Sequence, residues 1–389
     1  TFTDWRDVPD WANIGYPIGE CHSDGSVVMT KIDGTGGLVS IGTVAEQILY
    51  EVSDPADYIV ADVRCDFGQV QLEHIAPDRV RVTGARGHPP TDSYKVCVTY
   101  DCGWRAVAYQ PIIGEDAAAK AMRQGAALFA RARRALAAAD LPGFTLTDIV
   151  LIGGEASFGA HAAAPPTREV IAKLVADHPT QQGAALFARE QWAAISGMAV
   201  GTSINLATAV QPMTGLFQFL YAKDAIAPTW HIHGTQTALP AAKGFAALPQ
   251  TASESTIALP DTPGTVAVDL VQLAYARSGD KGHLFNVAVI ARRAEYLPYL
   301  KAALTADAVG EWYRHLGPNG APPRVDAYEA PGLNALNFVI NDALAGGINT
   351  NTRLDPAAKG MAQMLLRFPV KVPATIAATL SIAHPKEGE

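Results

Sequence analysis

The side chains best suited to chemistry lie in short polar segments framed by glycine or proline. The segment ARSGDKGHLFNVAVIAR, residues 276–292, places an acid–base pair between two glycines and between two apolar runs. A hairpin turn needs only Asn-Gly or Asp-Gly, so this loop has more charged and polar side chains than a turn requires. We expect Ser278 and Lys281 to bind substrate and Asp280 to act as an acid or base. The alternatives are an interdomain contact or a hairpin whose surface ion pair contributes little to stability.

A second segment, GTGG at residues 34–37, comes just before an expected helix that starts between residues 39 and 43. Backbone N–H groups at a helix N-terminus make an anion site when no side chains block the approach. The alternative is a tight strand-to-helix turn that needs positive φ, and neither GxGxxG nor a P-loop is present. We expect a phosphate or carboxylate to bind here, at Lys31, Gly34, Thr35, Gly36 and Gly37.

A third segment, RGHPPTDSYKV at residues 86–96, is polar and stiff because two prolines fix an extended loop. Arginine and lysine that flank such a loop suit a carboxylate or a phosphate. The alternative is a rigid loop that satisfies its own side chains. We expect substrate contacts from Arg86, Thr91, Tyr94 and Lys95, and acid–base chemistry from His88 and Asp92.

A fourth segment, GECHSDG, carries Glu20, His22 and Asp24 at alternate positions, which project to one face of an extended chain. The trio could do acid–base work, with Asp24 as the catalytic candidate, or hold a divalent metal together with Asp62 and Asp66. A solvated loop is the alternative. From sequence we assign neither a metal site nor a cofactor.

Two nucleophile hypotheses carry less support. Ser157 and His161 lie in IGGEASFGAH, whose spacing does not fit the GxSxG elbow. An N-terminal Thr1 would supply hydroxyl and amine together, as in self-processing hydrolases, but TFTDW does not resemble a core strand. From the sequence we assign no role to His231 and His233.

These segments need a layered α/β scaffold to position them. Alternating patterns predict a strand-rich meander over 58–113, and helical spacing predicts a helix over 116–139. TDIVLIGG at 147–154 predicts a buried parallel strand, and residues 167–178 and 184–199 predict two helices. We expect an α/β domain over 1–225, a linker over 226–265 and a small ferredoxin-like α+β domain over 266–389.

Composition excludes several functional classes. The 389 residues are 49% hydrophobic and 17% charged, with a net charge of -8. No Lys/Arg-rich run indicates nucleic acid, no apolar run is long enough to span a bilayer, and the polar N-terminus is not a signal peptide. Four cysteines without CxxC spacing favour a reducing cytoplasm. We therefore expect a cytoplasmic protein that binds neither nucleic acid nor membrane.

Four motifs carry a family resemblance. In order they are GYPIGECHSDGSVVMTKIDGTGGLVSIGTVAEQILYEVSDP, RVRVTGARGHPPTDSYKVCVTY, AYARSGDKG and EAPGLNALNFVINDALAGG. Together they resemble the acyclic terpene utilisation (AtuA) family, over nearly all of this chain but only the C-terminal part of a full-length member. The resemblance implies a bacterial or fungal protein of acyclic terpene and branched-acid breakdown, a pathway that runs largely through acyl-CoA thioesters.

From these features we expect an enzyme that acts on an anionic small molecule, a carboxylate or an acyl-CoA, as a hydratase, lyase or hydrolase. The alternative is a non-catalytic binding or scaffolding subunit, and a lesser one is the hydrolase with Thr1 as nucleophile. We also expect an oligomer, which could include an upstream N-terminal fragment or subunit.

Overall fold

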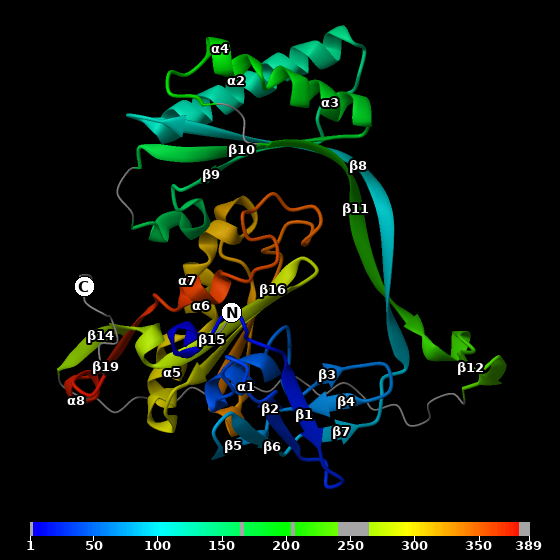
Figure 1. Ribbon diagram of the computed structural model, residues 1–389, viewed down its shortest axis with the longest axis vertical. Helices are drawn as coiled ribbons and strands as arrows, with labels where there is room; N and C mark the ends of the chain where they lie inside the picture. Colours follow the sequence, from blue (N-terminus) through cyan, green and yellow to red (C-terminus); the bar gives the residue numbers. More distant parts are fainter. Residues whose placement is uncertain (1–2, 164–166, 204–206, 240–263, 381–389) are drawn as a thin grey trace. The chain divides into compact units, whose positions relative to one another are not determined.

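The computed structural model describes residues 3–163, 167–203, 207–239 and 264–380, which group into two compact units (Figure 1). Unit 1 comprises Thr1–Val96, Phe219–Ala343 and Ala357–Glu389, and unit 2 comprises Cys97–Gln218 and Leu344–Pro356. Unit 1 is therefore assembled from segments far apart in the sequence.

The first part of unit 1 holds two small antiparallel sheets. The order of the larger sheet is β1-β2-β6-β5 and the order of the smaller is β3-β4-β7. Their strands are β1 (Pro17–Cys21), β2 (Val27–Lys31), β3 (Tyr58–Ile59), β4 (Arg64–Asp66), β5 (Gln71–Ala76), β6 (Arg79–Thr83) and β7 (Arg86–His88). This part confirms the strand-rich character predicted from residue 58 onward.

Helix α1 (Ile41–Ile48) follows the GTGG loop, where the sequence predicted a helix. Its start is fixed by a capping box, in which the Ser40 side chain accepts from the Thr43 N–H and the Thr43 side chain accepts from the Ser40 N–H. Ala45 and Leu49 are buried in a core with Val70, Ala288, Ile290, Ala330, Leu333 and Ala335. The helix therefore packs between the N-terminal sheet and the C-terminal part of the chain.

The C-terminal part of unit 1 is an antiparallel sheet of order β15-β16-β18-β17 with helices between its hairpins. Its strands are β15 (Ala274–Lys281), β16 (Leu284–Ala291), β17 (Val325–Ala330) and β18 (Ala335–Ile340). Around it lie α5 (Leu297–Ala303), α6 (Ala306–Trp312), α7 (Met361–Leu365), α8 (Ala374–Ala377), and the pair β14 (Thr265–Asp269) and β19 (Pro369–Pro373). This is the α+β arrangement predicted for this region.

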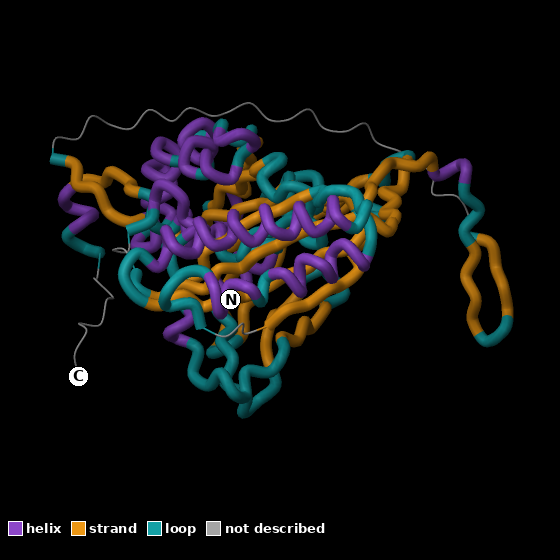
Figure 2. Tube along the Cα trace, turned by 90° about the horizontal axis from the view of Figure 1, so that it is seen from above, coloured by secondary structure: helices purple, strands orange, loops and turns teal. Residues whose placement is uncertain are grey.

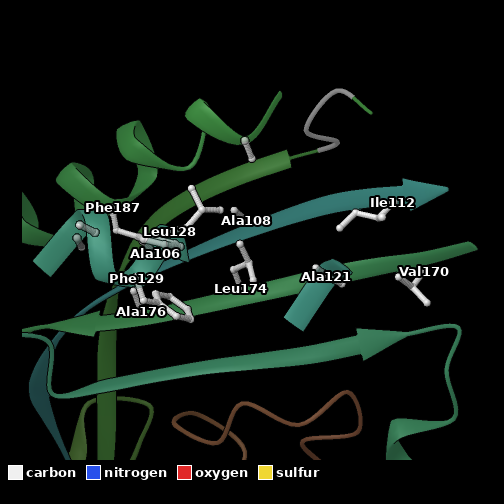
Figure 3. Packing of buried hydrophobic residues seen from close by; sticks show 14 of the residues in the cluster. Ala106, Ala108, Ile112, Ala121, Leu128, Phe129, Val170, Leu174, Ala176 and Phe187 are labelled. Carbon is white, nitrogen blue, oxygen red and sulfur yellow. The ribbon is translucent and has the colours of Figure 1, made fainter. Parts of the chain in front are cut away.

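Unit 2 is a sheet of order β11-β8-β10-β9 with helices on one face (Figures 1 and 2). Its elements are β8 (Ser93–Ile113), β9 (Leu146–Ile152), β10 (Glu169–His178), β11 (Ala207–Ala222), α2 (Ala117–Ala138), α3 (Gln181–Glu190) and α4 (Ala193–Gly197). The unit boundary falls inside β8 and inside β11. The core packs Leu128, Phe129 and Phe187 from the helices against Ala106 and Leu174 from the sheet (Figure 3).

Two sequence predictions for unit 2 were wrong. Residues 167–178, predicted as a helix, form β10, and the strand predicted as parallel is β9, which pairs antiparallel with β10. Val170, Ala172, Leu174 and Ala176 alternate toward the helices, and this period of two is typical of a strand. The charged and polar residues between them also suited a helical spacing, which misled the assignment.

The predicted linker lies partly outside the described residues, because residues 240–263 are not among them. Before that segment, β12 (Thr229–Ile232) and β13 (Thr235–Ala238) form an antiparallel hairpin. His231 lies on this hairpin and His233 is in its turn with φ 49°. Among the helices that the structure describes, none is long and apolar enough to cross a membrane.

Candidate functional site

A cluster of ionisable side chains lies where the end of α1 meets β15 and the turn before α7. We call Tyr50, Glu51, Asp280, Lys281 and Lys359 the Tyr50 cluster. Glu51 lies at its centre, because its Oε2 accepts from Lys281 Nζ at 2.7 Å and its Oε1 accepts from Lys359 Nζ at 2.6 Å. Lys359 Nζ also donates to the Tyr50 hydroxyl and lies 3.5 Å from Asp280 Oδ1.

Two cations lie over the ring of Tyr50. The Arg277 guanidinium carbon is 4.2 Å from the ring centroid and Lys359 Nζ is 4.5 Å from it. Both distances are within the range in which the ring quadrupole attracts a cation. The phenol hydroxyl therefore lies in a positively charged setting at the molecular surface.

The backbone beside the cluster is strained at two residues. Glu51 has φ 59° and Ala358 has φ 53°, a left-handed conformation that side chains other than those of Gly, Asn and Asp rarely adopt. Such strain costs on the order of 1–3 kcal/mol and persists only where the surroundings enforce it. One strained residue is Glu51 itself and the other directly precedes Lys359, and strained residues of this kind cluster at functional sites.

Two buried asparagines enforce the conformation of the Tyr50–Glu51 segment. Asn286 Oδ1 accepts from the Glu51 N–H at 3.1 Å, and Asn286 Nδ2 donates to the Leu49 carbonyl at 2.9 Å. Asn337 accepts from Asn286 at 2.8 Å and donates to the Val52 carbonyl at 2.9 Å. These bonds tie the end of α1 to β16 and β18, so the sheet fixes the position of the acid.

Ser278 and Gly279 shape the other side of the cluster. Ser278 is 2% exposed; its Oγ donates to the Ala358 carbonyl at 2.6 Å and accepts from the Ala362 N–H at 2.8 Å. A Cβ at position 279 would lie 2.5 Å from Glu51 Cγ and 2.7 Å from Tyr50 Cε2. Ser278 thus positions the turn that carries Lys359, and Gly279 leaves room for the acid and the phenol.

The electrostatics of the cluster follow from these contacts. Burial raises the pKa of Glu51, but hydrogen bonds from Lys281, Lys359 and Tyr50 outweigh it and lower that pKa to about 2. Burial lowers the pKa of Lys359, yet its bonds to Glu51 and Tyr50 leave that pKa raised. Glu51 is therefore an anion that holds two lysines in place.

A buried acid, Glu46, lies on α1 ahead of the Tyr50–Glu51 segment. Glu46 is 1% exposed, and its Oε1 accepts from the Thr3 N–H at 3.0 Å. Burial raises the pKa of Glu46, and the Thr3 bonds and the charge of Arg277 offset only part of that shift. Burial also lowers the pKa of Arg277, which Glu46 and Tyr50 partly oppose. The arrangement links the cluster to the N-terminal segment.

The structure brings together the predicted residues of the RSGDKG segment. Ser278, Asp280 and Lys281 all lie at the cluster, but they belong to strand β15 rather than to a loop. Only the turn at Gly282, with φ 66°, joins β15 to β16. Ser278 positions the backbone and is too deeply enclosed to contact a substrate directly.

The GTGG loop is held by its own hydrogen bonds. The Thr35 N–H donates to the Ile32 carbonyl and the Gly36 N–H donates to the Asn13 carbonyl. Lys31 Nζ donates to the Thr35 carbonyl and lies 3.3 Å from Asp78 Oδ2. Two of the expected amide donors are therefore engaged within the protein, and anion binding by this loop stays a prediction.

The RGHPPTDSYKV residues lie on β7, on the start of β8 and between them. Arg86 is exposed on β7, and His88 Nε2 is 3.9 Å from Asp66 Oδ2. Lys223 Nζ donates to the Thr91 carbonyl at 2.6 Å, and its backbone N–H donates to the Asp92 carbonyl at 2.9 Å. Lys223 also lies 5.0 Å from the Tyr94 ring centroid, and Lys95 is exposed. Their roles as ligand contacts stay predictions.

The GECHSDG residues satisfy one another or nearby strands. Asp24 accepts from the Ser26 N–H at 2.9 Å and from its hydroxyl at 2.7 Å, which lowers the pKa of Asp24. Glu20 pairs with Arg79 of β6. Within the described residues no three His, Cys, Asp or Glu side chains could hold a metal ion together. Thr1 lies outside the described residues.

Sequence reasoning missed Tyr50, Glu51 and Lys359 as members of one site. The first two follow helix α1, and Lys359 precedes helix α7 about 300 residues later, so only the tertiary fold joins them. One local signal was available: Gly279 lies inside β15, and a glycine inside a strand marks a bulge, a bend or the close approach of another segment.

Comparisons with known proteins agree with this architecture. The profile described as acyclic terpene utilisation family protein AtuA matches residues 1–232, and the AtuA ferredoxin-like domain matches residues 268–371. No curated protein and no solved structure matches the chain. Because the first profile covers more than half of the sequence, the chain belongs to the AtuA family of acyclic terpene utilisation.

Proposed function

We propose that the protein is an enzyme of acyclic terpene or branched-acid breakdown that binds a carboxylate or acyl-CoA at the Tyr50 cluster. The proposal is based on one observation: Tyr50, Glu51 and two lysines lie together, and buried asparagines hold the strained Tyr50–Glu51 segment in place. Lysine ammonium groups bind carboxylates and phosphates as point charges. The pathway in this proposal is inferred from membership of the AtuA family. The reaction is inferred from the side chains of the Tyr50 cluster.

The proposed reaction is proton transfer, of the hydratase or lyase type. Tyr50 is the proposed proton donor, because its hydroxyl lies in the cluster beside Lys359 and a phenol can act as a general acid. Asp280 is the base, since its side chain is partly exposed beside Lys359. Glu51, with a pKa of about 2, is too weak a base and instead positions the lysines.

Hydrolysis through a serine nucleophile at this cluster has less support. The Ser278 hydroxyl is enclosed, donates to the Ala358 carbonyl and accepts from the Ala362 N–H. A nucleophile needs an adjacent base and access to the reacting carbon. A positioning role accounts for Ser278 without chemistry of its own.

Calorimetric titration with a branched-chain enoyl-CoA and with the free acid tests the binding proposal. Lys359→Ala and Lys281→Ala should each raise Kd about tenfold or more, since a hydrogen bond to a charged group contributes about 1.5–3 kcal/mol. The matched control is Lys301→Ala, which removes a lysine paired with Glu329 at 2.6 Å in the same unit. An equal loss in the control would sink the proposal.

The polar residues near β2, β7 and β8 are proposed as additional groups of the site. The proposed substrate contacts are Lys31, Gly34, Thr35, Gly36, Gly37, Arg86, Thr91, Tyr94 and Lys95, and the proposed acid–base groups are Asp24, His88 and Asp92. Lys95→Ala in the same titration separates the two sets, because Lys95 is exposed and outside the Tyr50 cluster. A raised Kd in Lys95→Ala places this set at the ligand, and an unchanged Kd removes Lys95 from it.

We also propose a cytoplasmic location, since all four cysteines are free and reduced thiols are typical of that compartment. The second candidate function is a non-catalytic binding subunit, which the exposed apolar strand β11 favours. Turnover of any branched-chain acyl-CoA by the purified chain would reject that alternative.

A further inference from the structure

Thr3 joins the two elements that carry the Tyr50 cluster, and the reaction proposed above does not use it. Its backbone N–H donates to Glu46 Oε1 of α1 at 3.0 Å. Its hydroxyl donates to the Ala276 carbonyl of β15 at 3.2 Å and accepts from the Ala276 N–H at 3.0 Å. Thr3, Glu46 and Ala276 are 9%, 1% and 1% exposed, and all three belong to unit 1. Thr3 is therefore enclosed between the helix and the strand.

The backbone of Ala276 depends on this hydroxyl. Strand β15 is the outer strand in the order β15-β16-β18-β17, so within the described sheet strand pairing satisfies only one of its two sides. A buried backbone N–H or carbonyl needs a hydrogen-bond partner, and a hydroxyl can donate and accept at the same time. Thr3 therefore supplies at Ala276 the two hydrogen bonds that a neighbouring strand would supply.

Asp4 holds the same segment at a second point. Its two carboxylate oxygens accept from Arg292 Nη1 at 3.1 Å and from Arg292 Nη2 at 2.6 Å, which makes a bidentate pair. The Arg292 guanidinium carbon is 4.2 Å from the ring centroid of Tyr275, the residue before Ala276 on β15. Asp4 therefore helps to keep the Thr3 hydroxyl at Ala276.

The residue after Ala276 is Arg277, whose guanidinium carbon is 4.2 Å from the Tyr50 ring centroid. The hydroxyl of Ser278 fixes the residue that follows through two hydrogen bonds. Thr3 and Ser278 therefore hold β15 on either side of Arg277. A site that needs precise geometry depends on such supporting contacts behind its own side chains.

We propose that Thr3 is a positioning residue of the Tyr50 cluster, whose hydroxyl fixes β15 at Ala276 so that Arg277 stays over the Tyr50 ring. Thr3 contacts no group that binds or reacts in the proposed function. It acts through the strand that carries Arg277. The kinetic consequence rests on the proposed function, whereas the structural consequence does not.

The kinetic consequence follows from how the lysines are held. Lys281 and Lys359 are hydrogen-bonded to Glu51 rather than to Thr3. Loss of the Thr3 hydroxyl should therefore leave ligand binding nearly unchanged. It should lower kcat, because the ring of the proposed proton donor is held less precisely.

Fluorine NMR of the full chain labelled with meta-fluorotyrosine observes the Tyr50 ring without a substrate, and Tyr50→Phe identifies its signal. Thr3→Val keeps the shape of the side chain and removes the hydroxyl. It should shift the Tyr50 signal and speed amide hydrogen exchange at Ala276 by about tenfold or more. Thr3→Ser retains a hydroxyl and should return both readings toward those of the wild type. With a branched-chain acyl-CoA, Thr3→Val should lower kcat about fivefold or more and leave KM within about twofold.

Thr305→Val is the matched control, because it removes a helix-capping hydroxyl that accepts from the Ala308 N–H at 3.1 Å in the same unit. It should leave the Tyr50 signal in place. An unchanged Tyr50 signal in Thr3→Val, or an equal shift in Thr305→Val, overturns the proposal. If Thr3→Val does not fold, Asp4→Asn, which weakens the second anchor, is judged by the same two readings.

The kinetic measurement separates this proposal from the proposed function. An active wild type whose kcat is unchanged in Thr3→Val overturns the positioning role. A wild type that turns over no branched-chain acyl-CoA or acid rejects the proposed function alone, because the NMR and exchange readings still decide the role of Thr3.

Discussion

At the scale of single residues, Glu51 holds the two lysines of the Tyr50 cluster in place. It adopts a left-handed backbone conformation, accepts from two lysines and has a pKa of about 2. A group whose folded pKa lies below its ordinary value of 4.5 adds stability above that value. The contribution is lost as the pH falls through 4.5 toward 2.

Glu51→Gln should therefore be less stable than the wild type at pH 7, and the difference should shrink as the pH is lowered from 5 to 3. Urea unfolding of both proteins across this range measures the effect. Glu73→Gln serves as the control, because Glu73 forms only an exposed pair with Arg81 at 3.5 Å. A Glu51→Gln deficit that stays constant from pH 7 to pH 3 would contradict the linkage.

The close contacts of the site require a glycine at position 279. Gly279→Ala should move Tyr50 and Glu51, since the new Cβ would lie 2.5 Å from Glu51 Cγ, and should destabilise the fold by about 1–3 kcal/mol. It should also raise the Kd for a branched-chain acyl-CoA. Gly143→Ala is the control, because its Cβ would meet no atom within 4 Å. An unchanged Kd in Gly279→Ala would contradict this expectation, because it would show that ligand binding does not depend on the position of Glu51.

At the scale of elements, the segment after α1 depends on Asn286 and Asn337 rather than on its own sequence. Asn337→Ala removes the hydrogen bond to the Val52 carbonyl and one of the hydrogen bonds that the Asn286 amide group donates. We expect a loss of about 2–4 kcal/mol in the free energy of unfolding. Amide hydrogen exchange of Tyr50 and Glu51 should accelerate more than that of α6. Uniform acceleration would indicate that the asparagines stabilise the fold without positioning the site.

Helix α3 offers a test in which two principles oppose each other. Glycine-to-alanine in a helix normally stabilises by up to about 1 kcal/mol. At Gly183 the new Cβ would lie 2.2 Å from the buried His178 ring, which itself hydrogen-bonds the Pro142 carbonyl at 2.8 Å. We therefore predict that Gly183→Ala lowers the melting temperature. A raised melting temperature would mean that the ring moves without cost.

Several elements could be predicted from sequence because their signals are local. The helix predicted over 116–139 is α2, and the one after GTGG is α1, which begins after a capping serine. Strand β10 could not be predicted, since its period of two competes with a helical spacing. Within the region predicted as an α+β domain, a short 3-10 turn at Leu270–Gln272 separates β14 from β15.

The site was predictable only in part. Ser278, Asp280 and Lys281 were identified because they share one segment with two glycines. Tyr50 and Lys359 reach the same place through the pairing of β15 with β16 and the packing of α1 and α7 on the sheet. Apart from Gly279, which leaves room for Tyr50 and Glu51, the neighbouring sequence gives no sign of this packing.

At the scale of the whole molecule, unit 1 combines both matched family segments in one core. Ala45, Leu49 and Val70 from the first segment pack with Ala288 and Ile290 from the second. A chain cleaved at a protease site inserted within residues 240–263 should therefore remain associated on gel filtration. Separation of the two pieces without denaturant would contradict the shared core.

Solvent-deuterium incorporation into a branched-chain enoyl-CoA, followed by mass spectrometry, measures the proposed proton transfer by the Tyr50 hydroxyl. Tyr50→Phe keeps the ring that Arg277 and Lys359 contact and removes only the hydroxyl. We expect incorporation by the wild type and a loss of about 100-fold or more in Tyr50→Phe with nearly unchanged Kd. Equal incorporation by the two proteins, or none by the wild type with any branched-chain acyl-CoA or acid, would contradict it.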